Sequence, residues 1–262
     1  MDQNIEKIVD VLDELYKSLD SVRDDTIKNL GEEKALHISN YHADNCIDLI
    51  VTWIPSQYKD KESNNMVFMQ FTRMFKELYW LQFLFLAGNY PLIYRNLRYL
   101  LEMMAQAYYV DLKYHRLNID EKFEKIKDLE REFYGWNLIE HILTKICETN
   151  ISESNRESLI DNSHNIWKYY LNKHVHPSSI QMERDLFDEE DLYSSLVTDT
   201  FIKKCADDAL TTIDYVLDLI YAIIFSSYPR IGDSLLHDKF INKWKFHSPV
   251  TMKLVCECKE HT

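Results

Sequence analysis

Two short stretches of the sequence contain residues whose types and spacing could carry out chemistry. In the first, polar side chains recur every three or four residues along an otherwise apolar segment: Arg95, Arg98, Glu102, Gln106 and Tyr109. In an α-helix this spacing places them on one narrow face. A polar stripe on a buried helix must be paired or must line a cavity, because an unpaired buried charge is costly. The stripe is therefore the first candidate for a functional site.

The second stretch covers residues 167–178 and contains two histidines, His174 and His176, just before Pro177. We expect His174 at the C-terminal end of a helix, where the helix dipole favours the protonated ring. His176 would stand just past that end. A histidine that titrates near neutral pH can act as a general acid or base. The spacing alone is also typical of an ordinary helix end with two surface histidines, so both interpretations stay open.

Long helical segments are expected to position these residues. Apolar side chains at helical spacing predict helices over residues 2–30, 32–53, 66–87, 90–115, 120–149, 152–176 and 196–227, with a break near Gly135. The 152–176 helix should end at or before His176, because Pro177 disfavours helical geometry in the residue before it. Gly88 and Asn89 should turn the chain so that the third and fourth helices form an antiparallel pair. With only 4 Gly and 5 Pro in the chain, the sequence predicts a mainly α protein, an antiparallel helical bundle.

The last part of the chain differs in character from the rest. Phe240, Trp244 and Phe246 fall on one face at a period of two, and His247-Ser248-Pro249 is a turn signal. This pattern predicts a small β-hairpin. We therefore expect a helical domain over residues 1–228 and a C-terminal extension over residues 229–262.

The same extension contains three residues of types that bind metals. Cys256, Cys258 and His261 offer three zinc ligands, whereas a structural zinc site uses four and a longer cysteine spacing. Packing on one face of a strand explains the two cysteines without a metal. The sequence also lacks a glycine-rich phosphate loop and an H-E-x-x-H motif. It therefore predicts no metal and no cofactor.

Composition narrows the function classes further. The net charge of −13 disfavours general nucleic-acid binding outside local basic clusters. Five cysteines without a visible secretory leader indicate a reducing compartment, so we expect a cytoplasmic protein. The apolar runs 78–86 and 215–225 are too short for membrane spans. We interpret both as core helices and expect no membrane contact.

These motifs together resemble those of the HEPN-like all-helical superfamily. An R-x-x-x-E helix follows a G-N-Y turn at Gly88, and a later helix ends in H-V-H-P-S from His174 to Ser178. The resemblance covers about residues 66–228. It implies a four- or five-helix bundle that dimerises. It also implies either a metal-independent ribonuclease, such as those of defence systems or RNA turnover, or a noncatalytic binding module.

The sequence departs from the usual signature of that superfamily, an Arg four to six residues before a His on one helix. At that distance before His174 and His176 the sequence offers Lys168 but no Arg. If the resemblance holds, Arg98 or Arg95 must supply the cation, because Lys lacks the planar fork that matches a phosphate.

The resemblance then implies a simple reaction. Arg98 would hold the scissile phosphate of RNA, Glu102 would orient Arg98, and His176 would exchange a proton with the ribose 2′-hydroxyl or the leaving oxygen. Further substrate contacts would come from Arg95, Tyr170, Asn172 and His174. The alternative for Arg98 and Glu102 is an ordinary i, i+4 salt bridge inside the bundle.

Two function hypotheses follow, and both stay open at this point. One is a ribonuclease that acts on RNA. The other is a noncatalytic helical module that binds a nucleotide, a small ligand or a partner protein. The aromatic-rich helices offer more apolar surface than one bundle needs, which together with the resemblance predicts a homodimer.

Overall fold

The computed structural model describes residues 2–54, 64–150, 153–172 and 199–228, and within these ranges it is helical, without strands. The α-helices are α1 (Asp2–Leu30), α2 (Glu32–Ala35), α3 (Asp44–Ile47), α5 (Met66–Leu86), α6 (Tyr90–Lys113), α7 (Ile119–Glu132), α8 (Trp136–Asn150), α9 (Glu153–Ile166) and α11 (Asp199–Ser227). Three π-helical segments interrupt or extend them: η1 (Ile38–Ala43), η2 (Asp48–Trp53) and η4 (Trp167–Leu171).

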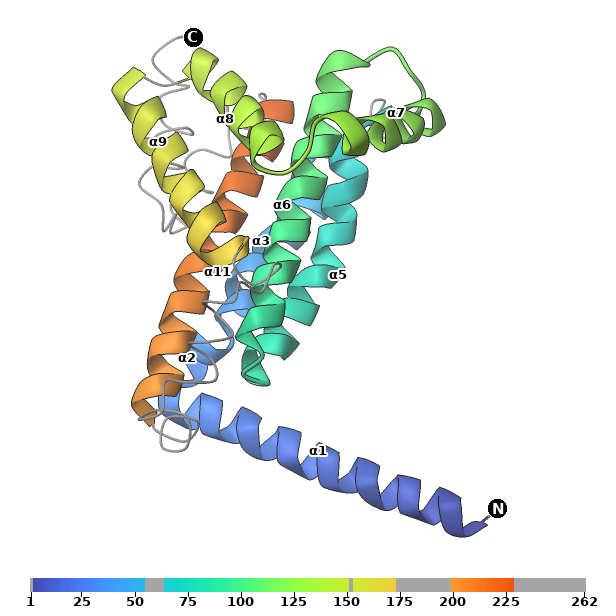
Figure 1. The fold of residues 1–262 in the computed structure, drawn as a ribbon, viewed down its shortest axis with the longest axis vertical. Helices are drawn as coiled ribbons and strands as arrows, with labels where there is room; N and C mark the ends of the chain where they lie inside the picture. Colours follow the sequence, from blue (N-terminus) through green and yellow to red (C-terminus); the bar gives the residue numbers. More distant parts are fainter. Residues whose placement is uncertain (1, 55–63, 151–152, 173–198, 229–262) are drawn as a thin grey trace.

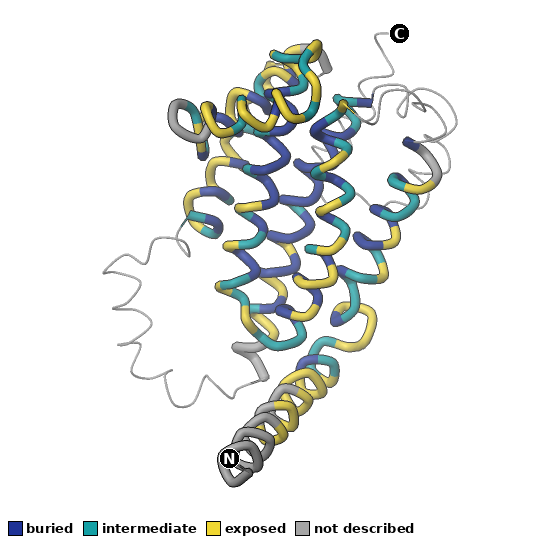
Figure 2. The backbone as a smooth tube through the Cα atoms, turned by 90° about the vertical axis from the view of Figure 1, so that its right-hand side faces the viewer, coloured by how far each residue is buried: buried dark blue, intermediate teal, exposed yellow. Residues whose placement is uncertain are grey.

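The centre of the bundle is formed by α5, α6 and α11, which lie side by side along their lengths (Figure 1). The Pro91 ring falls in the first turn of α6, where its missing N–H breaks no helical hydrogen bond. Fully buried side chains from these three helices include Phe71, Met74, Leu78, Phe85, Leu97, Leu100, Met104, Ile213, Val216, Leu217, Ile220 and Tyr221. Figure 2 shows that buried residues run through the middle of the bundle. Polar residues on α6 and α11 are therefore held against a rigid core.

Helix α11 contains the one described segment that is apolar and long enough to cross a membrane, Lys203–Ser227. In the structure, 67% of the most apolar window of this segment is buried against the bundle. This burial agrees with the prediction that residues 215–225 belong to a core helix.

The N-terminal helix α1 extends away from the bundle (Figure 1), and the described side chains along its outer part are exposed (Figure 2). It ends at Gly31, whose φ of 80° is a conformation that residues with a Cβ avoid. Thr26, in the last turns of α1, donates a hydrogen bond from its hydroxyl to the carbonyl of Leu86 at 3.3 Å. This contact ties the end of α1 to the turn between α5 and α6.

The beginning of α5 is fixed by groups from two other helices. The Asp111 carboxylate of α6 accepts the backbone N–H groups of Met66 and Val67 at 3.1 and 2.9 Å. It also accepts the ammonium of Lys122 of α7, at 2.7 Å, and that lysine is 3% exposed. The Asn65 side chain caps the same helix by accepting the N–H of Phe68 at 2.7 Å. A negative charge at a helix N-terminus is favourable, so Asp111 sets the register between α5 and α6.

The fold predicted from the sequence is confirmed in outline, with one difference in detail. Residues 32–53 are helical as expected, but they alternate between α-helical and π-helical geometry instead of forming one regular α-helix. The predicted break near Gly135 is confirmed, because α7 and α8 meet there at a φ of 62°. The predicted β-hairpin and the extension 229–262 lie outside the described residues, so these two expectations stay predictions.

Candidate functional site

The first polar cluster surrounds the guanidinium group of Arg98 on α6. Its Nε donates to Glu102 Oε1 at 3.1 Å, and its Nη1 donates to Asn172 Oδ1 at 2.8 Å. The guanidinium carbon lies 4.7 Å from the ring centre of Trp167, a cation–π distance. The Arg98 side chain is 16% exposed, so the group lies below the surface but can still be reached by solvent. Within the described part of the chain, Nη2 makes no hydrogen bond.

Trp167 and Asn172, the two partners of Arg98 outside α6, come from one π-helical turn. The N–H of Asn172 donates to the carbonyl of Trp167 at 2.7 Å, an i to i−5 hydrogen bond. In an α-helix, residues five apart point about 140° away from each other, since each residue turns the helix by about 100°. The wider π turn brings them to the same side, where both contact Arg98. The η4 segment therefore lies against Arg98.

The remaining residues of the predicted site take different positions. Tyr170 stacks at a tilt on Tyr94 of α6, with ring centres 5.9 Å apart, and Arg95 is exposed one turn before Arg98. His174 and His176 lie outside the described residues. The structure thus brings together Arg98, Glu102 and Asn172. The convergence of Arg98 with His176 stays a prediction.

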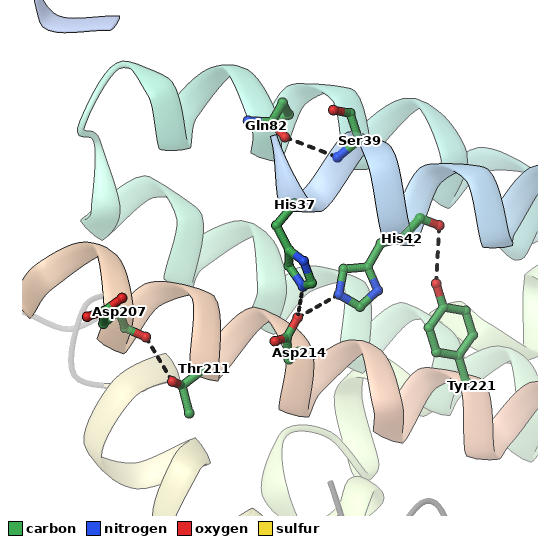
Figure 3. A network of polar contacts seen from close by, with 8 residues as sticks. All are labelled: His37, Ser39, His42, Gln82, Asp207, Thr211, Asp214 and Tyr221. Atoms are coloured by element: carbon green, nitrogen blue, oxygen red, sulfur yellow. Dashed lines mark hydrogen bonds and ion pairs between the residues drawn. The ribbon is translucent and has the colours of Figure 1, made fainter. Parts of the chain in front are cut away.

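A second polar cluster, which sequence reasoning missed, joins the η1 segment to α11 (Figure 3). The Nε2 atoms of His37 and His42 lie 2.8 and 2.7 Å from the same oxygen, Oδ1 of Asp214. The His42 ring is fully buried, the Asp214 side chain is 12% exposed, and His37 is 20% exposed. Two imidazoles and one carboxylate therefore converge on one point that opens to solvent on the side of His37.

A side chain from α5 explains why His37 and His42 share a face. In a regular α-helix the Ser39 N–H would donate to the carbonyl of Ala35. Here the Gln82 amide is inserted between them: its oxygen accepts the Ser39 N–H at 3.0 Å, and its nitrogen donates to the Ala35 carbonyl at 2.6 Å. Insertion of a side chain into the helical ladder is a known cause of local distortion. The chain then continues as the π turn η1, which places His37 and His42 together.

The electrostatics of the second cluster are dominated by buried acids on α11. Burial alone would raise the pKa of Asp214, but the hydrogen bonds from His37 and His42 outweigh burial and hold this pKa well below its ordinary value. Asp218, one helical turn further, is 4% exposed. Burial raises the pKa of Tyr41 well above its ordinary value, and the negative charges of Asp218 and Asp214 raise it further. Two carboxylates therefore act on the same small region.

Aromatic rings and one further hydrogen bond fix the orientation of the two imidazoles. The Tyr41 ring stacks on His37, with ring centres 5.2 Å apart and an interplanar angle of 12°. The Tyr221 hydroxyl donates to the carbonyl of His42 at 3.4 Å (Figure 3). The cluster is thus held by α5, by η1 and by α11 at once. Comparison with models of known protein families, with curated proteins and with solved structures found no match to this chain.

Proposed function

We propose that this protein binds RNA through the Arg98 cluster and cleaves it as a metal-independent ribonuclease, with His176 as the titrating group. The observation that carries the proposal is the fixed position of the Arg98 guanidinium between Glu102 and Asn172. A fixed planar guanidinium is suited to hold a phosphate by parallel hydrogen bonds. Asn172 is four residues before His176 in the sequence. Four residues span at most about 14 Å when extended, so this sequence separation is compatible with a contact between His176 and Arg98.

The roles of the individual residues follow from their contacts. Glu102 accepts from Nε of Arg98, so it orients the guanidinium while leaving Nη2 to donate to a phosphate oxygen. Stacking on the buried ring of Trp167 holds the plane of the guanidinium. His176 would then transfer the proton between the ribose 2′-hydroxyl and the leaving oxygen.

A second candidate is a noncatalytic module that binds a nucleotide or a partner protein, and one observation favours it. The Glu102 carboxylate already balances the charge of Arg98 at 3.1 Å, and the chain as a whole carries a net charge of −13. Both features weaken the long-range attraction that most nucleic-acid enzymes use. A ligand with a single phosphate group would bind the same guanidinium without a basic surface.

RNA cleavage by purified protein in the presence of a chelator separates these candidates. We expect cleavage of single-stranded RNA by the wild type and its loss in both Arg98→Ala and His176→Ala. The matched control is Arg73→Ala on α5, which removes an exposed arginine that lies 5.7 Å from the Tyr99 ring centre. Circular dichroism of each variant confirms that the bundle is intact. If Arg98→Ala cleaves RNA as well as Arg73→Ala does, the proposed ribonuclease site at Arg98 is refuted. Nucleotide that co-purifies with wild type but not with Arg98→Ala supports the binding module.

We also propose that the protein forms a homodimer through the outer face of α5. Tyr79, Trp80 and Phe83 on this face are 49%, 44% and 48% exposed, and the rings of Trp80 and Phe83 stack 5.2 Å apart. Exposed aromatic side chains of this kind are enriched in interfaces. Light scattering should give twice the mass of one chain at micromolar concentration and the monomer mass for Trp80→Glu. A monomeric wild type would refute the proposal.

A further inference from the structure

We propose that His37, His42 and Asp214 bind a divalent transition-metal ion of the Zn²⁺ class. The proposal does not depend on the proposed ribonuclease, which uses a different cluster and no metal. Two imidazole nitrogens and one carboxylate oxygen form a donor set that suits Zn²⁺ and neighbouring ions of the first transition series. The three ligand atoms lie within 4.8 Å of one another.

The geometry requires only small shifts for an ion to be accommodated. Ligand bonds of about 2.0–2.2 Å to a tetrahedral ion place the ligand atoms about 3.3–3.5 Å apart. The present Nε2 to Oδ1 separations are 2.8 and 2.7 Å. Side-chain movements of about 1 Å therefore replace the two hydrogen bonds to Oδ1 by three bonds to a metal. Each ring would then carry its remaining proton on Nδ1.

The local backbone is the second, independent observation that points to a ligand. Single π turns inside helices are rare and are found frequently at functional sites. Here the turn has one clear effect on side chains: it brings two histidines five residues apart onto the same face, opposite Asp214. Gln82 of α5 holds the turn open from outside the helix. A structural hydrogen bond to Asp214 would need only one histidine and no distortion.

Charge and access favour a cation at this position. Asp214 and Asp218 are both largely buried and lie one turn apart on α11. A cation bound by the Asp214 carboxylate would also be attracted by the nearby carboxylate of Asp218. The 20% exposure of His37 gives the ion a route from solvent, while the full burial of His42 provides the protected inner wall of the site.

The test uses the untagged full-length protein after dialysis against a chelator. Titration with Co²⁺ should give one equivalent bound per chain, with a visible absorption band that Zn²⁺ abolishes by competition. Zn²⁺ should also raise the melting temperature, because it binds only the folded state. His37→Gln and Asp214→Asn should each weaken Co²⁺ binding by at least about 100-fold, since removal of even an outer partner of a metal ligand costs about 10- to 100-fold.

Two control variants show which residues hold the ion. His164→Gln removes an exposed histidine of α9 that stacks on Trp136, and it should bind Co²⁺ as the wild type does. The double variant Cys256→Ser/Cys258→Ser should also retain binding. Absence of stoichiometric binding, or binding unaffected by His37→Gln, would overturn the proposal, as would loss of binding in the cysteine variant. If Asp214→Asn fails to fold by circular dichroism, His37→Gln decides the question alone, because His37 is partly exposed.

Discussion

Replacement of Gln82 by leucine tests the central structural claim, that a single side chain holds the η1 turn open. Gln82 is 7% exposed and satisfies two backbone groups, the Ser39 N–H and the Ala35 carbonyl. Leucine has a similar volume but can satisfy neither. The Ala35 carbonyl is buried and the Ser39 N–H is half-buried, so we expect a loss of about 2–3 kcal/mol in the free energy of unfolding.

The chain can respond to this replacement in a second way, and the two responses can be distinguished. If the helix closes into α geometry, the Ser39 N–H pairs with the Ala35 carbonyl and the loss of stability falls below about 1 kcal/mol. His37 and His42 then point about 140° apart, and only one of them can reach Asp214. In that case the protein regains stability but loses the His37–Asp214–His42 cluster.

Urea denaturation together with NMR of the histidine rings measures both responses. The matched control is Gln70→Leu, because Gln70 is half-buried on the same helix three turns earlier. We expect Gln82→Leu to show either the larger loss of stability or altered ring signals for His37 and His42. A Gln82→Leu protein as stable as Gln70→Leu, with both ring signals unchanged, would refute this expectation.

Two further predictions concern the buried groups away from both clusters. Asp111→Ala should lower the free energy of unfolding by about 3–5 kcal/mol, because it leaves the buried Lys122 ammonium without a carboxylate partner; Lys122→Met should cost less in the same urea titration, and an equal loss in both would contradict this account. Burial raises the pKa of Cys147 to about 12, so at pH 8 only about one thiol in 10⁴ is the reactive thiolate. Mass spectrometry after brief alkylation of the folded protein should therefore find Cys147 unmodified well after the half-buried Cys205, and comparable labelling of the two would show the expectation to be wrong.

Much of the helical framework could be predicted because its signals are local. The α5–α6 hairpin follows from Gly88 and Asn89 between two apolar segments, and the break at Gly135 follows from a single glycine in a charged helix. The Arg98–Glu102 pair follows from i, i+4 spacing, and the structure places these two side chains 3.1 Å apart. Each of these inferences needs only the regular α-helical period.

The His37–His42–Asp214 cluster could not be predicted in this way, for two physical reasons. His37 and His42 are five residues apart, a spacing that regular α geometry assigns to different faces. The residue that changes this geometry, Gln82, is 40 positions or more away from both histidines, and Asp214 is more distant still. The available signal was two histidines within a helical segment that also contains buried polar residues such as Asn45. That signal indicates a site only once the backbone is known to be π-helical there.

Both polar clusters are built on a π turn, and this similarity affects how the Arg98 variants must be interpreted. In each, a π turn presents residues i and i+5 to one charged group on a core helix: His37 and His42 to Asp214, and Trp167 and Asn172 to Arg98. A π turn is less stable by itself than an α turn, so contacts from outside the helix must stabilise it.

Gln82 has that role for η1, and Arg98 has it for η4 by donating to Asn172 Oδ1. Arg98→Ala therefore removes a cation and also releases the turn that leads toward His174 and His176. Arg98→Lys keeps the charge but loses the planar fork. If Arg98→Lys keeps the helical structure of η4 but does not cleave RNA, the guanidinium is required to bind the phosphate and is not required for the fold.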